Sequence, residues 1–482
     1  MLFNSLNFAL FLPIVFVLYW FVCNKSIRLQ NILLVIASYF FYACWDWRFL
    51  FLLVFSTLLD YITGIKMADA SNQKNKTFWF WLSITVNLGF LGFFKYYNFF
   101  IDSFAEVLSN IGFHVNPWTL QVILPVGISF YTFHGLSYVI DIYKDRIKPE
   151  RNFIDYSVFV SFFPLLVAGP IERATHLLPQ IQKKRTFDFT KAADGLRQIL
   201  WGLFKKIVIA DKCAQYANDI FNNSDDYSGS TLFLGAVYFA FQIYGDFSGY
   251  SDIAIGTARL FGIDLLRNFA YPYFSRDIAE FWRRWHISLS SWFRDYLYIP
   301  LGGSQGGTWM KIRNTIIIFV VSGFWHGANW TFIIWGLLNA LYILPSIFFK
   351  TNRNHLDIVA QHTYLPSWKE LFQIILTFNL TVFAWIFFRA TSLTHAMQYI
   401  SAMFSWSLFS MPTKMPANYN TFIMIGFFFC MEWLGRKDQF AIATFGLQWK
   451  RPLRWLFYYM LIIIILYCVN TKEQQEFIYF QF

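Results

Sequence analysis

Charged residues are scarce along this chain of 482 residues. Asp, Glu, Lys and Arg together make up 14% of it, whereas a soluble domain usually carries about 25%. The shortage extends over the whole length, which excludes an ordinary soluble protein and predicts an integral membrane protein. The alternation over about ten residues that marks a transmembrane β-barrel is also missing, so helices are expected to span the bilayer.

Cysteine is equally scarce, and its spacing argues against two kinds of stabilising site. The five cysteines stand far apart, with no CxxC pair, at positions 23, 44, 213, 430 and 468. Such spacing predicts neither a disulfide framework nor a zinc site. No HExxH motif is present either. We therefore expect no metal and no bound cofactor.

Apolar and aromatic residues take the place of the missing charge. The chain is 57% hydrophobic and contains 60 Phe, 27 Tyr and 20 Trp. A helix needs about 20 apolar residues to cross a bilayer, and comparable runs recur at 8–23, 29–45, 49–65, 78–94, 118–140, 153–168, 232–244, 315–349, 374–388, 422–433 and 453–469. We predict an all-α polytopic membrane protein in which residues 1–482 form one membrane domain of about 11–13 embedded helices.

The net charge of +11 is distributed as in a membrane protein, so no nucleic-acid partner is expected. Lys and Arg gather in short loops, and the loops at 25–28, 66–76 and 144–151 alternate as the positive-inside rule requires. This pattern places the N-terminus outside and those loops in the cytoplasm. The alternation fails after residue 151, where a re-entrant segment at 162–179 would restore it. The first twenty residues carry no Lys or Arg, which favours a retained first span over a cleaved signal peptide.

Residues 263–313 mix dense charge with dense aromatics, unlike the rest of the chain. Arginines such as Arg284 and Arg294 are too costly in hydrocarbon for this element to span as a lipid-facing helix. Helical spacing joins one apolar stripe, made of Phe281, Trp285, Leu289, Trp292 and Tyr296. We predict a helix that lies at the membrane interface or dips into the protein interior.

His326 lies in a run without charge that is too long for a single crossing. Residues 314–349 contain no Asp, Glu, Lys or Arg, so the helix must break or return. Gly323, Gly327 and Asn329 mark the expected break. Broken backbone at membrane depth must be buried in protein or line a cavity. An ionisable group there indicates function, although a structural histidine stays possible.

A second histidine, His286, lies in "FWRRWHISLSSWFRDYLYIP" and shares a helical face with Trp282, Ser290 and Phe293. It is either functional or an interfacial histidine in a basic aromatic belt.

A cluster of polar residues interrupts the apolar run at 242–262. It contains Asp246, Ser248, Tyr250 and Asp252. Buried carboxylates need partners, and we expect these from Arg259 or Arg267. Structural pairing and a catalytic or substrate-orienting role both remain open, and the same holds for Glu172 in "GPIER".

Several of these stretches resemble the membrane-bound O-acyltransferase superfamily, in the bacterial branch that contains the alginate O-acetylation membrane protein. The teichoic-acid D-alanyl transfer protein is a relative of that branch. The blocks that carry the resemblance are "DFSGYSDIAIG", "PYFSRDIAEFWRRWHISLSSWFRDYLYIPLGG" and "GFWHGANWTFIIWG". The resemblance implies a ring of helices around a thin core, with funnels from both membrane faces. His326 matches the family's catalytic histidine, and His286 matches the second histidine of this branch.

The resemblance also implies a reaction and its partners. An acyl group, most simply acetyl, would come from a cytoplasmic thioester donor, either acetyl-CoA or an acyl carrier protein. It would serve O-acetylation of an extracytoplasmic polysaccharide, through a separate SGNH-like acetyltransferase, at the bacterial cytoplasmic (inner) membrane. The tail at 471–482 ends in "FIYFQF", which resembles an aromatic motif whose tyrosine, here Tyr479, carries the acyl group.

The remaining candidate residues would bind substrate, stabilise the oxyanion or support the site. They are Asn329, Ser322, Trp325, Asp246, Tyr250, Asp252, Arg284 and Arg294. Three other functions stay open: D-alanyl transfer from a carrier protein, a polysaccharide or lipid transporter, and a scaffold for an extracellular enzyme. Transporters often carry inverted repeats, and no internal repeat is evident in this sequence.

Overall fold

The structure, a computed structural model, describes residues 1–113, 119, 124–166, 169–413, 420–469 and 477–478. Within these ranges every regular element is helical, so the prediction of an all-α protein is confirmed. The chain divides into two compact units. Unit 1 contains Met1–Ala192 and Ala258–Leu266, and unit 2 contains Ala193–Thr257 and Arg267–Phe482.

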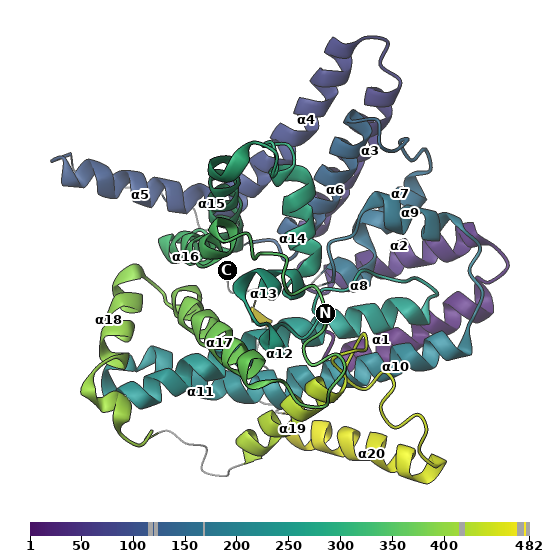
Figure 1. Cartoon of the computed structure of the whole chain (residues 1–482). Helices are drawn as coiled ribbons and strands as arrows, with labels where there is room; N and C mark the ends of the chain where they lie inside the picture. Colours follow the sequence, from purple (N-terminus) through teal and green to yellow (C-terminus); the bar gives the residue numbers. More distant parts are fainter. Residues whose placement is uncertain (114–118, 120–123, 167–168, 414–419, 470–476, 479–482) are drawn as a thin grey trace. The chain divides into compact units, whose positions relative to one another are not determined.

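Unit 1 holds the N-terminal helices, drawn in purple and blue in Figure 1. These are α1 (Leu6–Val17), α2 (Ile27–Ala43), α3 (Arg48–Ala68), α4 (Gln73–Leu91), α5 (Tyr97–Asn110), α6 (Ile128–Tyr143), α7 (Phe153–Ser161), α8 (Phe163–Leu166) and α9 (Ala174–Gln182). A buried carboxylate joins α3 to α4: Asp60 accepts hydrogen bonds from Ser83 Oγ at 2.6 Å and from Asn87 Nδ2 at 2.8 Å. Burial without such donors would destabilise the unit.

The segment at 162–179, expected to be re-entrant, is built from short helices. Helix α7 ends at Ser161, α8 has four residues, and α9 begins only at Ala174. Between them, the carboxylate of Glu172 is fully buried. It accepts the backbone N–H of Leu266 at 2.6 Å and lies 2.7 Å from His176 Nδ1. Glu172 is therefore structurally paired within unit 1.

Unit 2 holds most of the remaining helices. Helices α10 (Phe189–Leu203) and α12 (Gly229–Leu260) have their larger parts in it, and it contains α11 (Asp211–Asn222), α13 (Ile278–Arg284), α14 (Ile287–Phe293), α15 (Gly307–His326), α16 (Trp330–Phe348), α17 (Trp368–Arg389), α18 (Leu393–Met403), α19 (Asn420–Leu434) and α20 (Arg451–Cys468). Two π-helical segments, η3 (Phe204–Ala210) and η6 (Arg294–Tyr298), extend α10 and α14.

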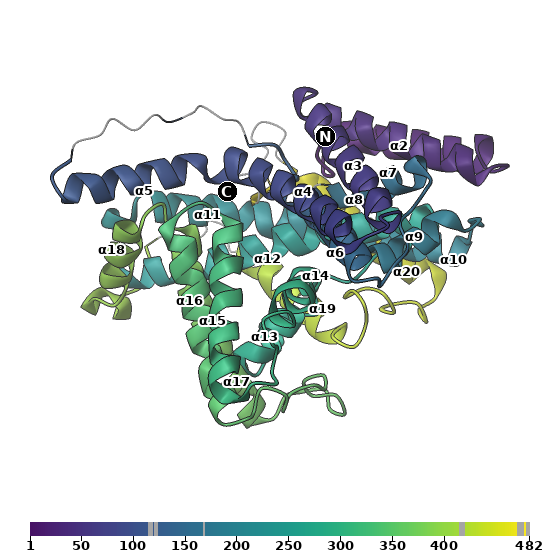
Figure 2. The same ribbon diagram turned by 90° about the horizontal axis from the view of Figure 1, so that it is seen from above.

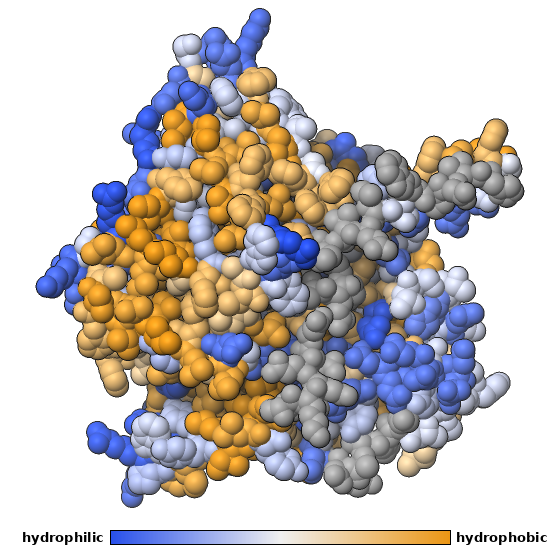
Figure 3. Space-filling view, turned by 180° about the vertical axis from the view of Figure 1, so that it is seen from behind, coloured by the Kyte–Doolittle hydropathy of each residue, from blue (hydrophilic) through white to orange (hydrophobic). Residues whose placement is uncertain are grey.

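Five helical stretches in the described residues are long and apolar enough to cross a membrane. They are Arg48–Ala68, Gln73–Asn110, Trp330–Phe348, Trp368–Arg389 and Arg451–Cys468, and shorter apolar helices occur at Leu6–Val22, Ile27–Ala43 and Asn420–Leu434. Many large apolar side chains on them are exposed, and hydrophobic residues gather over the left and central part of the face in Figure 3. The chain is a multi-pass membrane protein. The expected ring with two funnels stays a prediction.

Helices α15 and α16 form the hairpin that the charge-free run required. Helix α15 ends at His326, and α16 begins at Trp330; the two run side by side, next to α17, in Figure 2. Small residues allow this close approach. A Cβ on Gly323 would lie 2.2 Å from Phe332 O, and a Cβ on Gly336 would lie 2.2 Å from Phe319 O.

The helix predicted to carry the stripe from Phe281 to Tyr296 is interrupted, and its place at the interface or in the interior stays a prediction. The chain breaks into α13 and α14 at His286, whose φ of 43° and ψ of 56° are left-handed. Two backbone hydrogen bonds hold this break, from Ala270 N to Arg284 O and from Ile287 N to Asn268 O, both 2.9 Å. Hydrogen bonds to the loop before α13 thus replace those that would continue the helix through His286.

Candidate active site

His326 is the last residue of α15 and is 4% exposed. Three aromatic rings pack against its imidazole. The ring of Trp335 on α16 is perpendicular to it with a centroid distance of 5.1 Å, and the centroid of Phe388 on α17 lies 5.3 Å away. The ring centroid of the preceding residue, Trp325, lies 4.8 Å away. The imidazole therefore lies in an aromatic environment.

His286 lies between α13 and α14 and is 1% exposed. Its Nδ1 lies 3.2 Å from Asn268 Oδ1, and the edge of Phe247 packs against the ring at 4.6 Å. Its Nε2 is buried and hydrogen-bonds to none of the described residues. Burial lowers the pKa of His286 to about 3, because the charged form loses its hydration. The imidazole is neutral at physiological pH.

Asn268 orients this imidazole, and sequence reasoning missed it. Its Nδ2 donates to Ser251 Oγ at 3.1 Å, and its Oδ1 accepts from Ser288 Oγ at 2.6 Å. With the amide oriented in this way, His286 carries its proton on Nδ1 and donates it to Oδ1. The lone pair of Nε2 is then available as a base or hydrogen-bond acceptor. No local pattern reveals this, because Asn268 stands 18 residues before His286.

The indole ring of Trp325 lies close to the imidazole rings of both histidines. Its ring centroid lies 6.4 Å from that of His286 and 4.8 Å from that of His326. All three residues belong to unit 2. The structure therefore places both candidate catalytic imidazoles beside one buried indole.

The acidic cluster on α12 is paired with two lysines of η3. Lys206 Nζ lies 2.7 Å from Asp246 Oδ1 and 2.9 Å from Asp211 Oδ1. Lys205 Nζ lies 2.6 Å from Asp252 Oδ2. Both lysines are almost fully buried, as buried carboxylates require of their partners.

The expectation that Arg259 or Arg267 would supply these partners is wrong. Arg259 Nε lies 4.0 Å from Asp264 Oδ1, and Arg267 donates from Nε to Phe269 O. The lysines stand in the apolar run "FKKIVIA" at 204–210. Adjacent lysines inside an apolar run were the signal that could have identified them.

Tyr250 is fully buried on α12 and contacts the end of the chain. Lys206 Nζ lies 5.5 Å from the centroid of its ring. The ring of Phe477, itself 0% exposed, lies 4.5 Å from that of Tyr250. The next residue, Ile478, donates its backbone N–H to Asp246 Oδ2 at 2.7 Å. Tyr479 lies outside the described residues.

The other predicted support residues have varied surroundings. Asn329 caps α16 by accepting the N–H of Thr331, and its Nδ2 donates to Thr391 O at 3.0 Å. An oxyanion role for Asn329 would require exchange of that second bond. Ser322 is buried on α15, one turn before His326.

The two arginines predicted as support residues lie in ion pairs. Arg284 Nη2 lies 2.7 Å from Glu280 Oε1, and this carboxylate also binds Arg276. Arg294, which is exposed, pairs with its neighbour Asp295. Arg284 therefore stabilises the region around α13.

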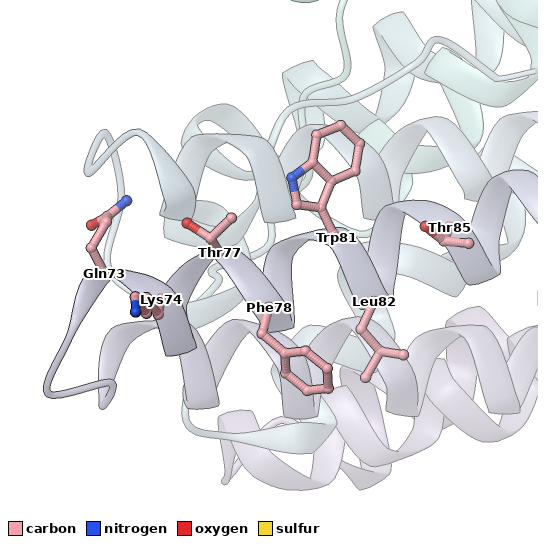
Figure 4. A pocket seen from close by; sticks show the side chains of 7 residues that line it. All are labelled: Gln73, Lys74, Thr77, Phe78, Trp81, Leu82 and Thr85. Atoms are coloured by element: carbon pink, nitrogen blue, oxygen red, sulfur yellow. The ribbon is translucent and has the colours of Figure 1, made fainter.

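Two hollows can be compared with this site. A cavity of about 10 Å³, room for about one water, borders Lys205, Ser251, Asp252, Asn268 and Glu432. The hollow of about 670 Å³ in Figure 4 lies along one face of α4 and is lined by Gln73, Lys74, Thr77, Phe78, Trp81, Leu82 and Thr85. All seven come from one helix in unit 1, and none of them is an acid or a histidine.

In the described part of the chain, no group of three or more His, Cys, Asp or Glu residues could hold a metal.

Comparison with known proteins identifies the class of this membrane protein. The family model of the membrane-bound O-acyltransferases matches residues 148–383, which include both histidines. The chain belongs to the membrane-bound O-acyltransferase family and is an O-acyltransferase.

The chain is similar to several named members of this family. It is 36% identical to the probable alginate O-acetylase AlgI of Pseudomonas putida, over 100% of both chains. It is 37% identical to the peptidoglycan O-acetyltransferase of Helicobacter pylori, over 84% of this chain and 80% of that protein. It is 29% identical to the teichoic acid D-alanyltransferase of Bacillus subtilis, over 61% of this chain and 76% of that protein.

Proposed function

We propose that this enzyme takes an acetyl group from a thioester donor, acetyl-CoA or an acyl carrier protein, at the cytoplasmic side of the bacterial inner membrane. The acetyl group serves O-acetylation of an extracytoplasmic polysaccharide, as the names of the alginate and peptidoglycan relatives suggest. One observation carries this proposal: His286 and His326 converge on Trp325, deep within unit 2.

The chemistry is acyl transfer from a thioester to a hydroxyl group. The hydroxyl oxygen attacks the thioester carbonyl, the C–S bond breaks, and the hydroxyl proton passes through imidazole to the leaving thiolate. A phenol has a pKa near 10 and a free imidazole near 6.5. Complete proton transfer before attack would cost about 5 kcal/mol, so His326 acts as a general base while the ester bond forms. The neutral His286, with Nε2 as an acceptor, orients the hydroxyl or relays its proton.

Tyr479 is the proposed acceptor of the acetyl group. The residues before it are seated in unit 2: Phe477 packs on Tyr250 and Phe247, and Ile478 binds Asp246. Phe247 in turn contacts His286. These contacts hold Phe477 and Ile478 near His286. The acetyl-tyrosine then passes its acetyl group to a separate SGNH-like transferase outside the membrane.

Variants of the purified protein test this function. His326→Ala should abolish acetyl transfer while expression and elution volume stay unchanged, because the general base is gone. Tyr479→Phe removes one oxygen and should be nearly as damaging. The intact mass of the C-terminal peptide should rise by one acetyl group in the wild-type protein only. Normal polysaccharide acetylation by His326→Ala cells would refute the catalytic assignment, and normal acetylation by Tyr479→Phe would refute the carrier.

D-alanyl transfer is the second candidate, because the chain is also similar to a teichoic acid D-alanyltransferase. The same acyl chemistry applies, with D-alanyl in place of acetyl. Parallel assays with acetyl and D-alanyl thioesters distinguish the two. Thioester turnover in detergent, without a membrane to cross, would also exclude a transporter that does no chemistry.

A further inference from the structure

A basic pocket of about 460 Å³ lies beside the α15–α16 hairpin in unit 2. It is separate from both histidines, although Ser290 on α14, one of its lining residues, stands one helical turn after His286. Its four cationic lining residues come from α13, η6, α15 and the loop after α16, and they are Arg283, Arg294, Lys311 and Arg353. No Asp or Glu is among its lining residues.

The four cations differ in how far their charge is satisfied. Arg283 donates hydrogen bonds to the backbone carbonyls of Asn352 at 2.7 Å and His355 at 2.9 Å. These two carbonyls position the guanidinium group but do not neutralise its positive charge. Arg294 is paired with Asp295. Within the described residues, the side chains of Lys311 and Arg353 make no hydrogen bond or ion pair. The pocket therefore has an excess of positive charge, which attracts an anion.

The pocket also has apolar lining residues. These are Ile318 and Phe319 of α15 and Ile343 and Ile347 of α16. The hydroxyl groups of Ser290, Tyr298, Ser304 and Thr315 add polar lining. A ligand that matches this lining has an anionic end with several acceptor oxygens and an uncharged chain.

We propose that this pocket binds a phosphate ester attached to a longer chain. A phosphate group offers several strong acceptor oxygens and up to two negative charges, which match guanidinium, ammonium and hydroxyl donors. Two sources carry this chemistry: a membrane phospholipid and the phosphate-bearing end of a thioester donor. The second source rests on the proposed function.

The position of the pocket relative to His326 is compatible with either source. Thr315 in the pocket and His326 stand eleven residues apart on α15, which is about 16 Å along the helix. The rings of Trp282 and Trp335 lie between Phe319 and His326, at centroid spacings of 5.2, 5.6 and 5.1 Å. A phosphate bound in the pocket would therefore lie beyond the aromatic rings that contact the imidazole of His326.

Binding measurements on the full-length protein test the pocket. The double variant Lys311→Gln/Arg353→Gln removes the two unpaired charges, and Arg451→Gln at the exposed start of α20 is the control for lost charge. Two probes are compared: coenzyme A titrated into protein in detergent, and phosphatidylglycerol retained from mixed nanodiscs. Removing a charged hydrogen-bond donor weakens a phosphate contact by roughly tenfold. We expect the double variant to lose coenzyme A affinity or phosphatidylglycerol retention by at least that factor.

The result assigns the source of the phosphate. Selective loss of coenzyme A binding identifies the donor, and selective loss of phosphatidylglycerol identifies the lipid. Unchanged binding of both probes, in a double variant that elutes and unfolds like wild type, overturns the proposal. Turnover of S-acetyl-N-acetylcysteamine, which has no phosphate, separates this result from the proposed function. The double variant should keep that turnover, whereas His326→Ala should lose it.

Discussion

At the residue scale, the amide of Asn268 determines which nitrogen of His286 can act as a base. It links Ser251, Ser288 and the imidazole in one buried network. The sequence predicted both histidines as candidates, His326 from its charge-free run and both from the resemblance of the surrounding blocks. Asn268 was not predictable, because its partners come together only through the tertiary fold.

Changing this amide should alter the pH dependence of acyl transfer. The folded pKa of His286 lies below that of a free histidine, so wild-type His286 keeps its basic lone pair throughout the assay range above pH 5. In Asn268→Asp, a carboxylate would favour the imidazolium. The acidic limb of kcat should therefore move to higher pH, with activity recovering as pH rises. Asn268→Ala should lower kcat by about tenfold or more without that shift.

Profiles of kcat against pH for the three proteins check this prediction. A purely structural role for Asn268 predicts equal losses at every pH in both variants. That outcome would remove Asn268 from the chemistry.

At the element scale, one break was predictable and one was not. The 314–349 run is too long for one crossing, so the hairpin between α15 and α16 follows from length alone. The break between α13 and α14 interrupts an apolar pattern that continues through it. It depends on backbone hydrogen bonds to residues 268 and 270, which sequence spacing does not report.

The glycines of the α15–α16 hairpin should be needed for stability. In Gly323→Ala the new methyl group would meet Phe332 O at 2.2 Å, and neither backbone can yield easily. Overpacking of this kind usually costs about 1–3 kcal/mol. We expect a lower thermal unfolding temperature and weaker acyl transfer, because His326 ends the same helix.

Gly426→Ala in α19 is the matched control, since a Cβ there meets nothing within 4 Å. It should leave the unfolding temperature unchanged or raise it slightly. Equal destabilisation by both substitutions would contradict the close-packing argument.

At the scale of the whole molecule, composition predicted an all-α membrane protein, and the charge pattern predicted its orientation. The two compact units could not be predicted, because α10 and α12 run from one into the other without a linker.

The orientation of unit 1 can be tested by single cysteines in a cysteine-free background. Cys44 is exposed in a loop expected outside, and Lys148 is exposed in a loop expected in the cytoplasm. A membrane-impermeant maleimide should label Cys44 in intact spheroplasts. It should label Lys148→Cys only after permeabilisation. The reverse pattern would invert the proposed direction of acyl transfer.

The left-handed backbone of His286 also decides how this position should be mutated. Asparagine adopts positive φ more readily than alanine or any β-branched residue. His286→Asn would thus delete the imidazole while the turn between α13 and α14 keeps its geometry. In His286→Val, lost chemistry and a rearranged chain would be measured together, so the choice of replacement decides whether an inactive enzyme reports on proton transfer or on a conformational defect.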